Sequence, residues 1–318
     1  MEDESRMLEE ASAANPAPMG IQRPGEPRVL VVLMVLLGLS LLFSLGGALL
    51  FQGIATLAGW DGSVLSGILA PDAAPPERWQ VRLLLAISHL STFVLAGWAT
   101  VRLFYPPTRE ALDYLGVRVA PGLKITVAGV LLMLVSVPLV LFLFQINKAL
   151  PLPESLRHLE DQTNEAIKGL LQMDSPLELL ANLALIALLP AIGEELVFRG
   201  IVQQQLLRRV TRPWVALVLT AAIFSFIHFQ FEGFLPRVLL GLLLGWLYWR
   251  TGNLWVSVAA HFANNGAQVL GQYLYSRDLS TIDMEQDIEV PWYAAVISIA
   301  LIWWIVRWIN TILSSDET

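Results

Sequence analysis

Three clusters of polar side chains interrupt the apolar runs of this sequence, and each contains residue types suited to acid–base chemistry. The first is the pair Glu194-Glu195, followed four residues later by Arg199. On a helix Glu195 and Arg199 are i,i+4 neighbours and can form an ion pair, whereas Glu194 points about 100° away and stays available as a general base. The structural alternative is a helix end at the membrane surface, where the same ion pair is solvated.

The other two clusters contribute histidines. Phe224 and His228 form a Phe-x-x-x-His pattern, and His261 and Asn265 lie four residues apart, on one face of a helix. An imidazole can take part in proton transfer, and imidazole and amide N–H groups can stabilise an oxyanion. Taken singly, each cluster also has a structural interpretation, as a packed histidine or as a hydrogen bond between two membrane helices.

The elements that carry these residues are predicted from a strongly apolar composition. The 318 residues are 55% hydrophobic and 15% charged, and the mean hydropathy is +0.60. A soluble domain is about 45–50% apolar and about 25% charged, so an ordinary soluble enzyme is excluded. The predicted fold is all-α, a polytopic membrane protein with about eight transmembrane helices and an intramembrane catalytic cavity.

The charge and cysteine content narrow the function classes further. The net charge of −7 gives no electrostatic support for binding nucleic acid. The chain has no cysteine, which excludes disulfides, thiolate metal sites and a cysteine nucleophile.

The apolar runs predict the order of the spans. They cover residues 29–51, 83–101, 125–145, 177–193, 214–231, 238–249, 254–275 and 290–306. The domain organisation expected from them is a disordered cytoplasmic tail at 1–28, N-terminal membrane helices at 29–145, a polar loop at 146–176 with an amphipathic helix over 154–171, a catalytic helical core at 177–275 and a C-terminal membrane helix at 290–313. Lys and Arg are more frequent on the side of the N-terminus, which predicts that both termini are cytoplasmic. The expected location is a bacterial inner (plasma) membrane.

The fourth and fifth spans are expected to form a hairpin that turns near residues 209–212. Glu194 lies about 16 residues before this turn and His228 about 17 residues after it, so at about 1.5 Å per residue both are roughly 25 Å from the turn. Antiparallel helices pack about 8–10 Å apart. The two side chains can therefore converge if they face the same way.

The three motifs together resemble those of the CPBP family of intramembrane proteases. This family includes the type II CAAX prenyl endopeptidases and the bacterial Abi, or bacteriocin self-immunity, proteins. The resemblance covers residues 177–275 and rests on three motifs in order: Glu194-Glu195-x-x-x-Arg199, Phe224-x-x-x-His228 and His261-x-x-x-Asn265.

The resemblance implies an endopeptidase that hydrolyses a peptide bond of a membrane-associated or lipidated peptide or protein with a Glu-activated water. It implies that Glu194 is the general base and that His228 assists it. His261 and Asn265 would form the oxyanion site. Glu195 and Arg199 would support the site or bind substrate.

Several alternatives stay open at this point. Glu194, His228 and His261 are the ligands if a metal such as zinc is bound, while a metal-free glutamate mechanism uses the same residues. His89 lies outside the motifs and is interpreted as a packing or hydrogen-bonding residue. A proton-coupled transporter and a non-catalytic immunity or partner-binding protein are the competing functions. The expected partners are membrane lipids and a peptide or lipidated protein substrate, with no nucleic acid, and the oligomeric state is left open.

Overall fold

The computed structural model describes residues 27–60, 73–281 and 288–315, and these residues form helices and connecting turns without any strand. The all-helical prediction is confirmed for this part of the chain. Apart from its last two residues, the predicted tail at 1–28 lies outside the described residues, as does part of the acidic segment before the last helix.

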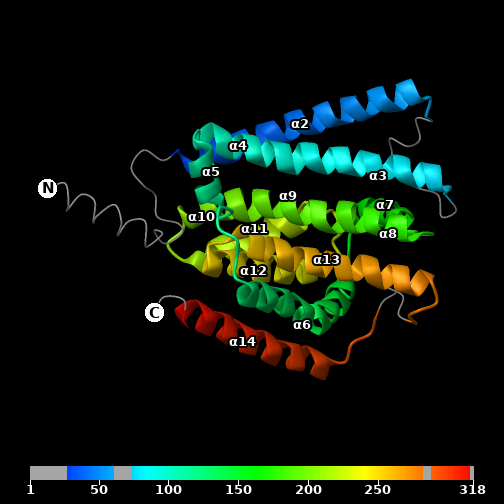
Figure 1. The fold of residues 1–318 in the computed structure, drawn as a ribbon. Coiled ribbons are helices and arrows are strands. Elements are labelled where there is room, and N and C mark those ends of the chain that lie inside the picture. Colours follow the sequence, from blue (N-terminus) through cyan, green and yellow to red (C-terminus); the bar gives the residue numbers. More distant parts are fainter. Residues whose placement is uncertain (1–26, 61–72, 282–287, 316–318) are drawn as a thin grey trace.

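The N-terminal half contains three long helical stretches (Figure 1). α2 spans Val29–Ala58. A second continuous helix consists of α3 (Pro75–His89), the π-helical segment η2 (Leu90–Leu95) and α4 (Ala96–Phe104). The short α5 (Thr108–Leu115) then leads to α6 (Leu123–Lys148), and the polar loop that follows contains α7 (Glu154–Leu171).

The C-terminal half begins with another continuous helix, which contains two π-helical segments. It consists of α8 (Pro176–Asn182), η3 (Leu183–Leu188), α9 (Leu189–Val197), η4 (Phe198–Gln203) and α10 (Gln204–Leu207). The remaining helices are α11 (Pro213–Phe226), α12 (Phe234–Thr251), α13 (Leu254–Ser276) and α14 (Trp292–Ser315). The predicted hairpin turn is present, because α10 ends at Leu207 and α11 begins at Pro213.

Local sequence signals account for several of these helix starts. Proline occupies the first turn of α3, α8 and α11. Backbone N–H groups in a first turn have no acceptor within the helix, so the absence of an N–H on proline costs nothing there. Ser175 accepts a hydrogen bond from the backbone N–H of Glu178 and caps α8, and Asn253 caps α13 in the same way through Trp255. These local signals therefore predict helix starts at the positions where the structure has them.

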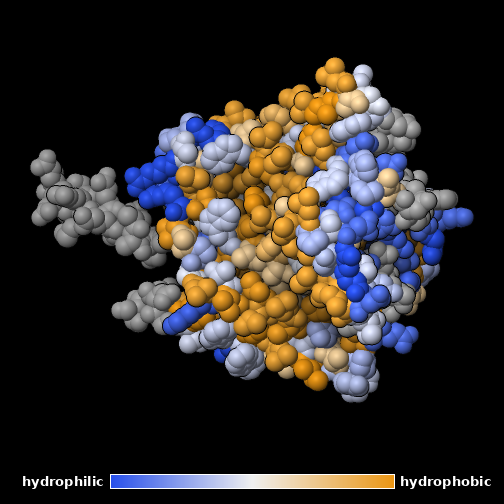
Figure 2. Space-filling model, turned by 45° about the vertical axis from the view of Figure 1, so that its right-hand side comes forward, coloured by the Kyte–Doolittle hydropathy of each residue, from blue (hydrophilic) through white to orange (hydrophobic). Residues whose placement is uncertain are grey.

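The surface of the bundle is that of an integral membrane protein. Apolar residues form a broad zone across the middle of the molecule in Figure 2, and hydrophilic residues gather toward its left and right edges. On α2, Met34, Leu41 and Leu49 expose more than 60% of their surface, as is typical of side chains that face lipid.

Among the described residues, five helices are long and apolar enough to cross a membrane: Val29–Ala58, Pro75–Phe104, Leu123–Lys148, Pro176–Leu207 and Trp292–Ser314. The helices α11, α12 and α13 fall below that length or hydropathy, so the predicted number of eight spans is not confirmed.

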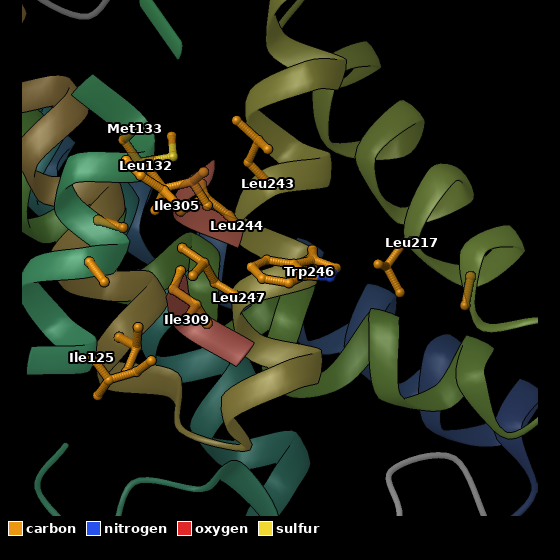
Figure 3. Close-up of a cluster of buried hydrophobic side chains, with 14 of the residues drawn as sticks. Ile125, Leu132, Met133, Leu217, Leu243, Leu244, Trp246, Leu247, Ile305 and Ile309 are labelled. Atoms are coloured by element: carbon orange, nitrogen blue, oxygen red, sulfur yellow. The ribbon is translucent and has the colours of Figure 1, made fainter. Parts of the chain in front are cut away.

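Two large clusters of buried apolar side chains join the helices of the bundle. The larger joins α6, α11, α12, α13 and α14, with Leu132, Leu244 and Ile309 among its buried members (Figure 3). The other joins α2, α4, α5, α9, η4 and α11. In Figure 1, α9 lies in the middle of the bundle, between α3 and α13, and it contacts both of them. A side chain on α9 is therefore shielded from lipid by helices from both halves of the chain.

Candidate active site

Glu194 is the centre of a buried group of polar side chains. Its side chain lies on α9 and the residue is only 6% exposed. The Nε2 atom of His89 lies 3.4 Å from its Oε1, while the Nε2 atoms of His228 and His261 lie 4.0 and 3.8 Å from its Oε2. One carboxylate is thus surrounded by three imidazoles, from the end of α3, the turn after α11 and the helix α13, in the interior of an apolar bundle.

The π-helical segments on both sides of α9 set the register of this carboxylate. η3 ends just before α9 and η4 begins just after it, so that Glu194 and Glu195 lie in a short α-helical stretch between two wider turns. A π-helical turn rotates the following residues relative to a regular α-helix, and such turns occur frequently at functional sites. The direction in which Glu194 points therefore depends on both interruptions.

Glu195 faces a second, fully buried set of partners. Its Oε1 accepts hydrogen bonds from Arg199 Nη1 and from His261 Nδ1, each at 2.8 Å. Glu195 and Arg199 are both 0% exposed. The predicted i,i+4 ion pair is therefore present, and it lies inside the protein rather than at a solvated helix end.

Arg199 connects this ion pair to the neighbouring helices. Its Nη2 donates a hydrogen bond to the backbone oxygen of Gly241 on α12 at 3.0 Å, and its guanidinium lies 4.8 Å from the ring centroid of Phe224. The Phe224 ring also lies against the rings of His228 and His261. Phe224 thus fills the space between the two histidines and the arginine.

His228 is held by the turn that follows α11 rather than by a helix. The predicted fifth span was to carry His228 within a helix reaching residue 231, and this is wrong, because α11 ends at Phe226. The His228 Nδ1 donates to the backbone oxygen of Phe224 at 2.6 Å. This bond leaves Nε2 to face Glu194.

The turn that contains His228 is tied to α7. Glu160 of α7 accepts hydrogen bonds from the backbone N–H groups of Phe231 and Glu232, and Asn164 accepts one from the side chain of Gln230. Burial raises the pKa of Glu160 above the ordinary value of a glutamate, although the two backbone donors act in the opposite direction. The polar loop therefore supports one wall of the site.

The structure brings together five of the six residues predicted from sequence: Glu194, Glu195, Arg199, His228 and His261. Asn265, in contrast, accepts a hydrogen bond from Asn264, and no hydrogen bond joins it to those five in the described part of the chain. His89, predicted from sequence to be a packing or hydrogen-bonding residue outside the motifs, lies against Glu194. The only sequence signal that pointed to its place in the site was a polar side chain within an apolar run.

The site contains the donor types of a metal centre without their arrangement around a common point. Glu194, His228 and His261 have the donor types of a zinc set, but no group of three or more His, Asp or Glu side chains within residues 27–60, 73–281 and 288–315 is arranged to hold a metal ion. The Nδ1 of His261 is bonded to Glu195 and that of His228 to a backbone oxygen, which leaves both Nε2 atoms to face Glu194. This arrangement fits both alternatives, because ligating histidines commonly donate their other ring N–H to such acceptors.

Comparison with known proteins identifies the segment that carries most of this site. Residues 176–267 match the family model of the type II CAAX prenyl endopeptidase Rce1-like proteins. The match confirms, over this segment, the resemblance to CPBP family membrane proteases that the three motifs predicted. Searches of curated proteins and of solved structures found no match.

Proposed function

We infer that the chain, as a CPBP-type membrane protease over residues 176–267, is an intramembrane endopeptidase in which Glu194 activates a water molecule. The observation that carries this inference is the convergence of three imidazole Nε2 atoms on one buried carboxylate, at 3.4–4.0 Å. The preferred substrate class is a membrane-associated or lipidated peptide, in keeping with the match to type II CAAX prenyl endopeptidases.

The distances around Oε2 suit a water-activation site. Separations of 3.8 and 4.0 Å are too long for direct hydrogen bonds, yet one water can bond to both atoms of each pair. A water held by Glu194 Oε2 and the two Nε2 atoms is oriented by all three groups. Burial lowers the local dielectric and strengthens each of these interactions.

The proposed reaction has two steps. In the first, Glu194 Oε2 takes a proton from the water while the water oxygen bonds to the carbonyl carbon of the peptide, which leaves a negative charge on the carbonyl oxygen. In the second, the C–N bond breaks, the carbonyl re-forms, and the leaving amine takes the proton from Glu194. The protein ends in the state in which it began.

His261 is the best-placed group to stabilise the negative charge. Its Nδ1 donates to Glu195, whose own charge is balanced by Arg199. A buried carboxylate behind an imidazole fixes its tautomer and stabilises its protonated form, which is then a strong donor to an oxyanion. We propose the same role for Asn265 after it leaves its bond to Asn264.

The test is cleavage of a peptide with an S-farnesylated cysteine followed by three C-terminal residues, by purified protein in lipid nanodiscs. We expect wild type to release the tripeptide and Glu194→Gln to lower kcat by about 10²–10⁴-fold. Glu110→Gln makes the same chemical change at an exposed position on α5 and should keep full activity. A chelator should leave the rate unchanged.

The same assay can reject the proposal. Equal kcat for wild type and Glu194→Gln would exclude Glu194 as the base. Loss of activity with chelator and its return with zinc would replace the metal-free mechanism with a metal-dependent one. An unlipidated version of the peptide measures how much the farnesyl group contributes to KM.

A further inference from the structure

A third imidazole reaches Glu194 from outside the matched segment. His89 is the last residue of α3, in the N-terminal half of the chain, whereas the family match begins at residue 176. Its Nε2 lies 3.4 Å from Glu194 Oε1, and it is the nearest of the three imidazoles to that carboxylate. The other two face Oε2. The two oxygens of Glu194 therefore have different surroundings.

A close helix–helix contact brings His89 to this position. Gly193, immediately before Glu194, lies so near η2 that an added Cβ would be 2.9 Å from the Cβ of Phe93. The His89 and Phe93 rings stack, with centroids 5.1 Å apart and planes inclined by 26°. The packing of α9 against η2 thus fixes the distance between His89 and Glu194.

We propose that His89 is a positioning residue that holds Oε1 of Glu194 and so aims Oε2 at the reacting water. The proposal rests on the proposed function of Glu194 as the base. The terminal torsion of a glutamate is broad, so an unrestrained carboxylate samples many orientations. A donor on one oxygen removes this freedom and leaves the other oxygen in the gap between the imidazoles of His228 and His261.

The geometry favours this role over simple packing. An apolar side chain of similar size would stack on Phe93 equally well, and a polar group in an apolar span has a cost unless it meets a partner. The Nε2–Oε1 separation is at the long end for a hydrogen bond, as is common for catalytic bonds that tighten when substrate is present. The site is therefore composite, with α3 supplying a part that the matched segment lacks.

The test compares three substitutions of His89 in the farnesylated-peptide assay. Gln places an amide N–H near the position of Nε2, Asn places it one bond short, and Phe keeps the stacking on Phe93 but has no donor. We expect His89→Phe and His89→Asn to lower kcat by about 10–100-fold with KM within twofold of wild type, and His89→Gln to recover most of the rate. Wild-type kcat in His89→Phe, or equal loss in all three variants, would overturn the proposal.

A second measurement does not depend on activity. The melting temperatures of His89→Phe, Glu194→Gln and the double variant, measured in the same detergent, form a double-mutant cycle. We expect the double variant to shift the melting temperature less than the sum of the single shifts, by on the order of 2–5 °C. Additive shifts would refute a bond between the two side chains even if no peptide is cleaved. Coupled shifts without cleavage in wild type would refute the proposed function and keep the bond.

Discussion

The contact of Gly193 with η2 gives the most direct test of how the fold positions the site. Replacing Gly193 with Ala adds one methyl group, 2.9 Å from Phe93 Cβ and 3.2 Å from Val94 Cγ2. Ordinary contacts between carbon atoms are about 3.5–4.0 Å. Phe93 must therefore withdraw by about 0.6–1.1 Å, and His89, which stacks on it, withdraws with it. The distance between His89 Nε2 and Glu194 Oε1 then grows from 3.4 Å to about 4 Å, beyond hydrogen-bond range.

The energies predict a large change in rate with a small change in stability. Overpacking costs about 1–3 kcal/mol, and alanine in place of glycine inside a helix returns about 1 kcal/mol. The net loss of stability for Gly193→Ala is therefore about 0–2 kcal/mol. A displacement of about 1 Å at a catalytic group can cost about 100-fold in rate. We expect kcat to fall by about that factor while KM stays close to wild type.

Gly46→Ala is the matched control for this variant. Gly46 lies in the interior of α2, and an added Cβ there meets no atom within 4 Å. The control should keep wild-type kcat and melt at the same or a slightly higher temperature. Both variants are assayed with the farnesylated peptide and by thermal unfolding. If Gly193→Ala keeps wild-type kcat, the contact between Gly193 and η2 does not control the geometry on which catalysis depends. If Gly46→Ala loses as much activity, the effect of Gly193→Ala is not specific to this contact.

Three further predictions follow from the surroundings of the site. Arg199→Met leaves Glu195 buried without its cation and should destabilise the protein by about 3–5 kcal/mol. The double variant Arg199→Met with Glu195→Leu should melt at a temperature closer to that of wild type and stay inactive. Recovered activity in the double variant would contradict the role of Glu195 behind His261. Because burial raises the pKa of Glu160, the stability linked to its titration is present below the ordinary pKa of a glutamate and is lost as pH rises through the folded-state pKa. Glu160→Gln should flatten this part of the curve of melting temperature against pH, and an unchanged curve would disprove the linkage. Asn265→Leu should lower kcat by about 10²–10³-fold with KM unchanged if Asn265 turns to the oxyanion, whereas a lower melting temperature with unchanged kcat would assign it to its bond with Asn264 alone.

The sequence was informative wherever side-chain polarity changes along the chain. The helix predicted over 154–171 is present with those bounds, because its polar and apolar residues alternate at the helical period. The convergence of Glu194 and His228 was also predicted, from residue counts about the hairpin turn and the helix rise. The count came out right although η4 interrupts one helix and His228 lies two residues beyond the end of the other. Where the chain is apolar on every side, periodicity gives no signal. The early end of α11 at Phe226 and the π-helical segments η3 and η4 lie in such runs, and sequence patterns did not predict them.

His89 was underestimated for a physical reason that applies to other membrane proteins. It is separated from Glu194 by 105 positions, so neither helical spacing nor a local motif relates the two residues. Their proximity is created by a glycine, Gly193, which has no side chain and therefore carries no chemical signal of its own. A glycine directly before a carboxylate in an apolar helix does, however, indicate that another helix can approach the backbone there. Combining that indication with polar residues of other spans would have made His89, on the helix that packs against Gly193, a candidate partner of Glu194. Glu194 and two of the imidazoles around it lie within residues 176–267, but the third imidazole comes from α3, so the N-terminal helices contribute to the candidate site as well as to the fold.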